Sequence, residues 1–220
     1  LWIELPLAAR HEAVEHLVAK GIPVITLVTD LPSSARLAYV GIDNRAAGAT
    51  AAYLVGQWLG PGSATVLLTL SSSRFRGEEE REVGFRALLR SERPDLRIVD
   101  LAETEGLDHT ISQQVAQVAQ RNQIDAVYSI GGGNRGLLQS LARAGQHPRV
   151  VVAHDLDEEN TSLLANGKVS AVLHHDLRSD ARRVCRLLMQ AHGAVPGAPR
   201  TEYSSVTVVT PYNLPVGEPG

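Results

Sequence analysis

The sequence predicts an α/β fold in which parallel sheets carry helices on both faces. Short apolar runs alternate with amphipathic stretches along all 220 residues, and repeated strand–helix alternation is typical of such sheets. The chain is 44% hydrophobic and 20% charged, which supplies enough apolar material for one or two compact domains. No internal repeat of about 20–50 residues and no low-complexity block breaks the pattern.

In the first part of the chain, helices are indicated by apolar residues on one face and strands by short apolar runs. The first helix places Val14 and Leu17 on one face and ends at Gly21. The second is rich in alanine and glycine, which permit close packing. The predicted order is helix 11–20, strands 22–29 and 38–42, helix 45–59, strand 64–70, polar loop 71–76, helix 77–90, strand 96–101, helix 110–121 and strand 125–130.

The second part continues the alternation after a glycine-rich turn. Cys185 lies on an apolar helix and is expected to be a buried structural thiol. The segment GAVPGAPR at 193–200 is the most linker-like stretch, because proline and glycine interrupt regular structure. The predicted order is helix 134–144, strand 150–154, helix 158–166, strand 171–174, helix 179–191 and a final strand 204–209.

Composition argues against several classes of protein. No apolar run approaches the roughly 20 residues of a membrane-spanning helix, and a single cysteine excludes an internal disulfide. The formal net charge is −3 and the basic residues are scattered, so we do not expect this part of the protein to hold DNA. The start of the chain lacks the basic and apolar segments of a secretion signal, which favours a cytoplasmic protein.

The stretch SIGGGNRGLL at 129–138 matches a loose dinucleotide-binding pattern. Gly131, Gly133 and Gly136 form G-x-G-x-x-G between a predicted strand and helix, and Asp155 stands at the end of the next strand. Such fingerprints usually open their domain, whereas this one follows several strand–helix units. A nicotinamide site, a variation of another ligand cleft and a tight turn without a ligand remain as alternatives.

Polar side chains at the ends of several predicted strands favour a different ligand. In an open parallel sheet, ligands bind beyond the carboxyl ends of the strands. The mixture of hydroxyl, carboxylate, amide, imidazole and guanidinium groups suits a polyhydroxylated molecule, because each ligand hydroxyl both donates and accepts hydrogen bonds. These groups occur at Thr29–Asp30, Asp43–Asn44, Ser71–Arg76, Asn134, His154–Asp155 and His174–Asp176.

Several segments resemble the effector-binding domain of LacI/GalR-family transcriptional regulators, in the family's order. YVGIDNRAAGATAAYLVGQWLG at 39–60 is similar to V-x-x-D-N-x-x-x-G-x-x-A-x-x-L, and REVGF at 81–85 is similar to R-x-x-G-F. VVAHD at 151–155, AVLHHD at 171–176 and VTVVTPYNLP at 206–215 resemble later segments of the family. The sharpest departure is at 130–136, where the family usually has an Asn-Asp pair.

The resemblance implies a periplasmic-binding-protein-like type I fold, with two Rossmann-like lobes joined by a hinge of three segments. It places 1–59 and 175–195 in an N-terminal lobe whose first strand–helix units are missing, and 60–174 and 196–220 in a C-terminal lobe. It also implies that the DNA-binding headpiece is absent from this chain. Ligand-driven closure of the lobes in a homodimer is expected to alter operator binding through that headpiece.

The same resemblance implies a set of ligand-binding residues. The alternative for Asp43, Asn44 and Asp155 is capping of the helices that follow them. The alternative for Arg81 is a solvated ion pair with the glutamates around it. The implied residues are Asp43, Asn44, Arg81, Asn134, Asp155 and His175, with Glu4 and Thr29 as weaker candidates on early loops.

No catalytic, cofactor or metal site is recognised. The chain has no G-x-S-x-G elbow, H-E-x-x-H pair or phosphate loop, and His174 and His175 point to opposite faces of a strand without a third ligand. We therefore predict a non-enzymatic domain of a LacI-type regulator that binds a sugar or sugar-like metabolite, with no cofactor and no membrane contact. The alternatives are a periplasmic sugar-binding protein of an uptake system and an NAD-dependent oxidoreductase.

Overall fold

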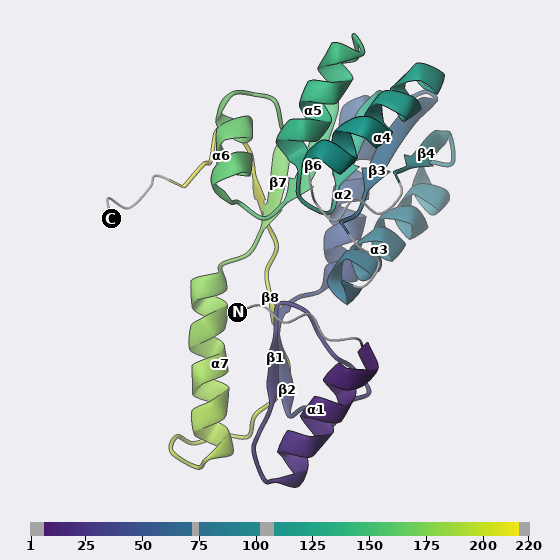
Figure 1. Ribbon diagram of the computed structural model, residues 1–220. Helices are drawn as coiled ribbons and strands as arrows, with labels where there is room; N and C mark the ends of the chain where they lie inside the picture. Colours follow the sequence, from purple (N-terminus) through teal and green to yellow (C-terminus); the bar gives the residue numbers. More distant parts are fainter. Residues whose placement is uncertain (1–6, 72–74, 102–107, 216–220) are drawn as a thin grey trace. The chain divides into compact units, whose positions relative to one another are not determined.

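The computed structural model describes residues 7–71, 75–101 and 108–215, and the chain divides into two compact units. Unit 1 consists of Leu1–Asp43 and His175–Ser205, and unit 2 consists of Asn44–His174 and Val206–Gly220. The chain therefore passes from one unit to the other three times. Both units combine sheets with flanking helices, which confirms the predicted fold class (Figure 1).

Unit 1 contains a small parallel sheet with the strand order β1-β2-β8. Figure 1 shows helices α1 and α7 on opposite sides of it. Its buried core is formed by Ala38, Val40 and Leu187, against which Ile25 and Val184 pack. The elements are α1 (Leu7–Ala19), β1 (Ile25–Leu27), β2 (Ala38–Ile42), α7 (Leu177–Ala191) and β8 (Glu202–Ser204).

Unit 2 contains a larger sheet with the strand order β4-β3-β5-β6-β7-β9. The first five strands are parallel, and β9 pairs with β7 in the antiparallel direction. The strands are β3 (Ala64–Thr69), β4 (Leu96–Asp100), β5 (Ala126–Ser129), β6 (Val150–His154), β7 (Ala171–His174) and β9 (Thr207–Val209). The helices are α2 (Asn44–Leu59), α3 (Arg76–Glu92), α4 (Asp108–Arg121), α5 (Asn134–Arg143) and α6 (Glu158–Ala165).

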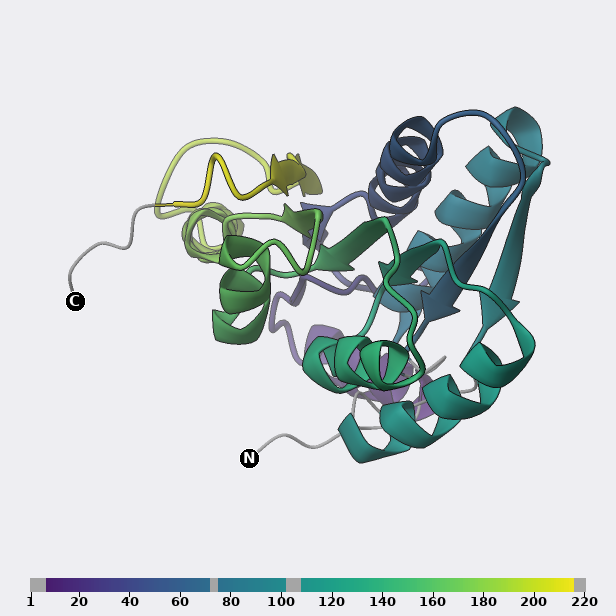
Figure 2. The same cartoon turned by 90° about the horizontal axis from the view of Figure 1, so that it is seen from above.

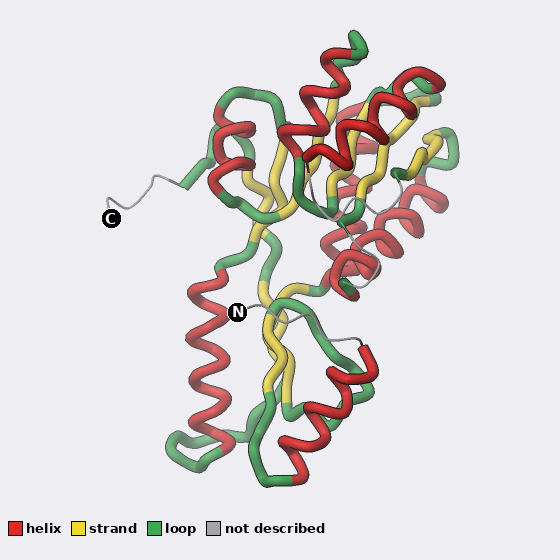
Figure 3. Tube along the Cα trace, viewed as in Figure 1, coloured by secondary structure: helices red, strands yellow, loops and turns green. Residues whose placement is uncertain are grey.

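The central strands β3, β5 and β6 of unit 2 are buried on both faces, so most of their residues are apolar. Successive residues point to opposite faces: Val66 and Leu68 belong to the core under α2 and α3, whereas Leu67 belongs to the core under α4, α5 and α6. Figure 2 shows these two helical layers on either side of the sheet, and Figure 3 shows the layers by element type. The helices therefore cover both faces of the sheet.

The final predicted strand, 204–209, is two strands in the structure. β8 pairs with β2 in unit 1, whereas β9 pairs with β7 in unit 2. The prediction of one strand was wrong because an apolar run shows that a segment is extended but does not show which neighbour its backbone pairs with. The antiparallel pairing of β9 also departs from the predicted parallel arrangement.

The contacts of α2 and β8 also differ from the predicted division into lobes. Residues 44–59 were assigned to the N-terminal lobe and 196–205 to the C-terminal lobe. In the structure, α2 packs against α3 in unit 2, and β8 is hydrogen-bonded to β2 in unit 1. The family-like motifs indicate where the chain crosses between the units. Only the packing shows to which unit the helix or strand beside each crossing belongs.

Cys185 is exposed, which corrects the prediction of a buried thiol. It lies on α7, where the buried residues are Asp180 and Leu187. The small sheet of unit 1 covers only one face of this helix, so apolar residues on the other faces are left uncovered. Among the described residues, no helix combines the length and apolar character needed to cross a membrane.

Candidate ligand-binding site

The carboxyl ends of the central strands of unit 2 carry polar side chains, of which His154 was predicted and Thr69 and Ser129 were not. β3, β5 and β6 are parallel neighbours, so Thr69, Ser129 and His154 end their strands at the same edge of the sheet. The Thr69 hydroxyl donates a hydrogen bond to the Ser129 hydroxyl over 3.2 Å. This is the edge at which open parallel sheets bind ligands.

Two glycines bring helices α2 and α3 into backbone contact beside this edge. A Cβ atom on Gly48 would lie 1.9 Å from the carbonyl oxygen of Arg81, and one on Gly84 would lie 2.1 Å from that of Arg45. Such close approach of two backbones requires glycine. These are the glycines of the segments DNRAAG and REVGF, and their contact places Asn44 next to Arg81.

Arg81 is a buried guanidinium that meets two other parts of unit 2. Its side chain is 7% exposed, its Nε donates to Asn44 Oδ1 over 2.9 Å, and a terminal nitrogen lies 3.8 Å from Asp155 Oδ2. Its terminal amino groups form no hydrogen bond with other residues in the described part of the chain. Because the side chain is buried, the solvated ion-pair alternative is wrong.

Asp155 presents a carboxylate from the loop after β6. Its side chain is 59% exposed, and its φ of 64° is the left-handed conformation, which is uncommon for a residue other than glycine. The cap of the following helix is Asp157, whose side chain accepts a hydrogen bond from the Asn160 N–H. The Asp155 carboxylate is therefore not used as that cap, and it lies beside the unused donors of Arg81.

A buried phenol packs against α3, the helix that carries Arg81. Tyr128 stacks on Phe85 with ring centroids 4.3 Å apart, and its hydroxyl lies 2.8 Å from His154 Nε2. Burial raises the pKa of the Tyr128 phenol far above its usual value, and the positive charge of Arg81 only partly opposes this shift. The phenol therefore stays neutral.

Asn134 is hydrogen-bonded to Asn160, a residue that the sequence analysis did not identify. It is 3% exposed, and its Nδ2 donates to Asn160 Oδ1 over 2.8 Å. Asn160 in turn donates to the carbonyl oxygens of His154 and Asp155. No sequence motif marks this pairing, because an asparagine three residues after a helix cap is ordinary. The structure therefore uses the amide donor of Asn134 within the protein, and its predicted ligand contact stays a prediction.

His175, Asp43 and Thr29 belong to unit 1. His175 is 2% exposed, and its Nδ1 lies 2.7 Å from Asp180 Oδ2, so the imidazole is held inside the unit. Asp43 is exposed just after β2. Thr29 follows Val28, which has a φ of 67°, and this turn ends β1 before the predicted strand end. Their roles in ligand binding stay predictions, and Glu4 lies outside the described residues.

The glycine-rich turn after β5 has structural roles that need no dinucleotide. A Cβ atom on Gly131 would lie 2.5 Å from the backbone nitrogen of Ser71, so the two loops approach too closely for a side chain. Gly133 has a φ of 78° and is the N-cap residue that precedes α5. Gly136 is buried inside α5. The pattern thus reflects backbone packing and the start of a helix.

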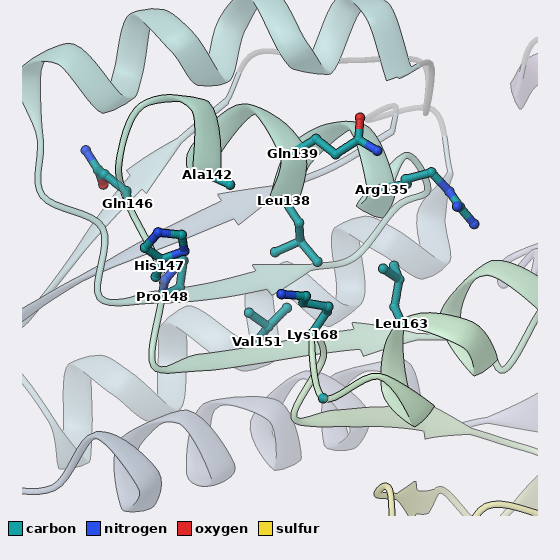
Figure 4. A pocket seen from close by; sticks show the side chains of 11 residues that line it. Arg135, Leu138, Gln139, Ala142, Gln146, His147, Pro148, Val151, Leu163 and Lys168 are labelled. Atoms are coloured by element: carbon teal, nitrogen blue, oxygen red, sulfur yellow. The ribbon is translucent and has the colours of Figure 1, made fainter.

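A cavity of about 480 Å³ lies on another part of unit 2, between α5, β6 and α6 (Figure 4). Leu138, Val151 and Leu163 contribute apolar side chains to its lining, and Arg135 and Lys168 contribute charged ones. Val151 lies near the start of β6, whereas Asp155 follows its end. We place the candidate site at Arg81 and Asp155 because several elements bring complementary polar groups together there.

The comparisons with known proteins agree with this fold. Residues 6–193 match the family of the periplasmic binding protein domain. The chain is similar to GanP, a glucose-galactose binding protein from Geobacillus stearothermophilus, with 20% identity, a TM-score of 0.85 and coverage of 96% of this chain and 76% of that one. No curated protein sequence matches the chain.

Two further solved structures were obtained with sugars. A solute binding protein of an ABC transporter from Burkholderia graminis C4D1M, in complex with D-arabinose, has 22% identity, a TM-score of 0.85 and coverage of 94% and 73% of the two chains. Another from Agrobacterium vitis, with bound D-fucose, has 20% identity, a TM-score of 0.83 and coverage of 94% and 72%. At these identities the likeness concerns the fold, and the family match covers most of the chain. The chain belongs to the periplasmic binding protein domain family.

Proposed function

We propose that this protein binds a sugar or a related polyhydroxylated metabolite at Arg81 and Asp155. The observation that carries the proposal is the buried Arg81 guanidinium, whose terminal nitrogen lies 3.8 Å from an exposed carboxylate. The bond from Nε to Asn44 holds the plane of the guanidinium, which leaves the terminal donors for a ligand. The guanidinium donates hydrogen bonds and the carboxylate accepts them. Together they can therefore bind one ligand hydroxyl, or two neighbouring ones, as both acceptor and donor.

The function favoured first is the sugar-binding component of an uptake system. Support comes from the similar structures, which are described as a glucose-galactose binding protein and as ABC transporter solute binding proteins with D-arabinose or D-fucose. Binding without chemical conversion is the activity that this role requires. The partner of the loaded protein is then a membrane permease, and the place of action is outside the cytoplasm.

The second candidate is the effector-binding domain of a LacI-type regulator in the cytoplasm. It is favoured by the segment around Asp43 and Asn44, by REVGF, and by the Asn-Leu-Pro ending at 213–215. In this case the protein is a homodimer whose partner is operator DNA, bound through a headpiece outside this chain. The sequence of the complete gene decides between the candidates, because a secretion signal supports uptake and a helix-turn-helix segment supports regulation.

Sugar binding is tested by calorimetry on the protein and two variants. A thermal-shift screen with pentoses, hexoses, polyols and sugar phosphates first identifies a ligand, because a ligand that binds only the folded state raises its stability. Arg81→Ala and Asp155→Ala are each expected to weaken that ligand at least tenfold, which corresponds to about 1.4 kcal/mol. Both variants should unfold cooperatively.

Arg86→Ala is the matched control, because Arg86 lies on the same helix and pairs with Glu82 and Asp100 away from Asp155. Its affinity for the sugar should equal that of the parent protein. Unchanged affinity in both Arg81→Ala and Asp155→Ala contradicts the proposed site. Saturable binding of NADH, with no response to any sugar, contradicts the proposed ligand class and supports an oxidoreductase.

A further inference from the structure

Asn160 stands at the centre of a buried amide cluster next to Asp155. It is 3% exposed, and its Nδ2 donates to the carbonyl oxygen of His154 over 2.9 Å and to that of Asp155 over 2.8 Å. Its Oδ1 accepts from Asn134 Nδ2 over 2.8 Å. Its backbone N–H is bonded to Asp157 Oδ1 over 2.7 Å. The side chain thus joins the end of β6, the start of α5 and the first turn of α6.

The chemistry of the partners fixes the orientation of both amides. Backbone carbonyl oxygens only accept hydrogen bonds, so the atom of Asn160 that faces His154 and Asp155 must be its NH₂ group. Its oxygen then faces Asn134, which must present its own NH₂ group in return. Asn134 Oδ1 is left buried with no hydrogen-bond partner among the described residues. The bond to Asn160 uses the NH₂ group of Asn134. The oxygen of Asn134 is therefore the atom left to accept a hydrogen bond from any further group.

The Asp155 peptide is held on both sides. Its N–H donates to the Leu173 carbonyl over 3.0 Å, and its carbonyl accepts from Asn160. Between these bonds φ is 64°, a left-handed conformation that costs energy for residues other than glycine, although less for aspartate than for most. The direction in which Cβ leaves the backbone depends on φ and ψ. The bond from Asn160 therefore helps to determine where the Asp155 carboxylate lies relative to Arg81.

We propose that Asn160 is a positioning residue of the ligand site, which acts by holding Asp155 in its left-handed conformation. The inference rests on the proposed function only insofar as Asp155 contacts the sugar. Asn160 touches no ligand in this scheme. Its loss lets the Asp155 peptide relax toward negative φ, and the carboxylate then leaves the place beside Arg81 from which it accepts a ligand hydroxyl.

The first test needs no ligand. The three-bond coupling between the amide and α protons of Asp155, measured by NMR, reports φ at this residue. Asn160→Ala and Asn160→Ser should both change it, because neither side chain can reach the two carbonyls and Asn134 together. Asn166→Ala is the matched control, since Asn166 makes an exposed amide-to-carbonyl bond to Ser162 on the same helix. An Asp155 coupling that is unchanged in a folded Asn160 variant overturns the proposal, whether or not a sugar is found.

The second test separates positioning from general structural support. In the parent background, Asn160→Ser should weaken the sugar about tenfold, the effect of losing one well-placed hydrogen bond to a charged group. In the Asp155→Gly background it should weaken the sugar by less than about twofold, because the carboxylate that it positions is gone. An equal loss in both backgrounds shows that Asn160 acts independently of Asp155 and overturns the proposal. A parent protein that binds no sugar while the NMR result holds rejects the proposed function but leaves the positioning of Asp155 supported.

Discussion

The contact between α2 and α3 at Gly48 predicts how one methyl group affects stability. In Gly48→Ala the new Cβ would lie 1.9 Å from the Arg81 carbonyl oxygen. Because side-chain Cβ atoms essentially never approach other atoms within 3.0 Å, the helices must move apart by at least 3.0 − 1.9 = 1.1 Å. The obstacle is a backbone carbonyl, which cannot rotate away as a side chain can.

The expected loss of stability in Gly48→Ala is the difference between two opposing effects. Overpacking of a close contact costs about 3 kcal/mol when the neighbour is rigid, the upper part of the usual range. Replacing glycine by alanine inside a helix returns about 1 kcal/mol through helix propensity. The net loss of stability is therefore about 2 kcal/mol, a decrease of about 4–8 °C in the melting temperature for a chain of this size.

The assay combines urea unfolding with sugar titration. Gly48→Ala should unfold at lower urea and also bind sugar more weakly, because Arg81 shifts with its carbonyl. Gly56→Ala on the same helix is the control: its Cβ would meet only the flexible Arg93 side chain, at 3.2 Å, so its stability should stay within about 1 kcal/mol of the parent protein. If Gly48→Ala proves as stable as Gly56→Ala, the reasoning from backbone contact is refuted.

Two further predictions concern α7 and its neighbours in unit 1. Asp180 is 1% exposed and accepts hydrogen bonds from the buried His175 and the half-buried Ser204. Asp180→Ala should lower the free energy of unfolding by about 3 kcal/mol in urea titrations, because it leaves the buried His175 imidazole without its partner; a loss below about 1 kcal/mol contradicts this. The N–H of Ser179 stabilises the ionised form of Asp176 and lowers the pKa of that carboxyl below 3.8. This contribution is present above the unfolded pKa and is lost as the pH falls through the lowered one. Asp176→Asn, which keeps a neutral capping oxygen, should therefore show a weaker loss of stability as the pH falls below the ordinary pKa of an aspartate, about 4; identical acid profiles would disprove the assignment.

Local sequence patterns determined most of the secondary structure. The strand at 38–42 and the strand at 171–174 have the predicted bounds, because buried parallel strands are short apolar runs between turn residues. The alanine-rich character of α2 correctly indicated close packing, since small residues let helices approach. Family-like spacing also singled out Asn44, Arg81 and Asp155, which the structure brings together in unit 2.

Pairing and burial were beyond the reach of local pattern. Residues 202–204 and 207–209 form two short strands close together in the sequence, yet β8 and β9 pair in different units, because their partner strands lie far away in the chain. Cys185 lies in an apolar helix but is exposed, because the face of α7 that packs against the sheet is the one with Leu187 and Val184.

The sequence by itself determined that this chain forms parallel sheets between helices and that polar groups gather where the strands end. Both follow from residue periodicity and from the common direction of parallel strands. Only the tertiary structure decided that Gly48 lies against the Arg81 backbone, that Asn134 faces Asn160 and that Asp155 is held at positive φ. These are contacts between residues distant in sequence or a backbone state imposed by such contacts, and their geometry exists only once the layers have packed.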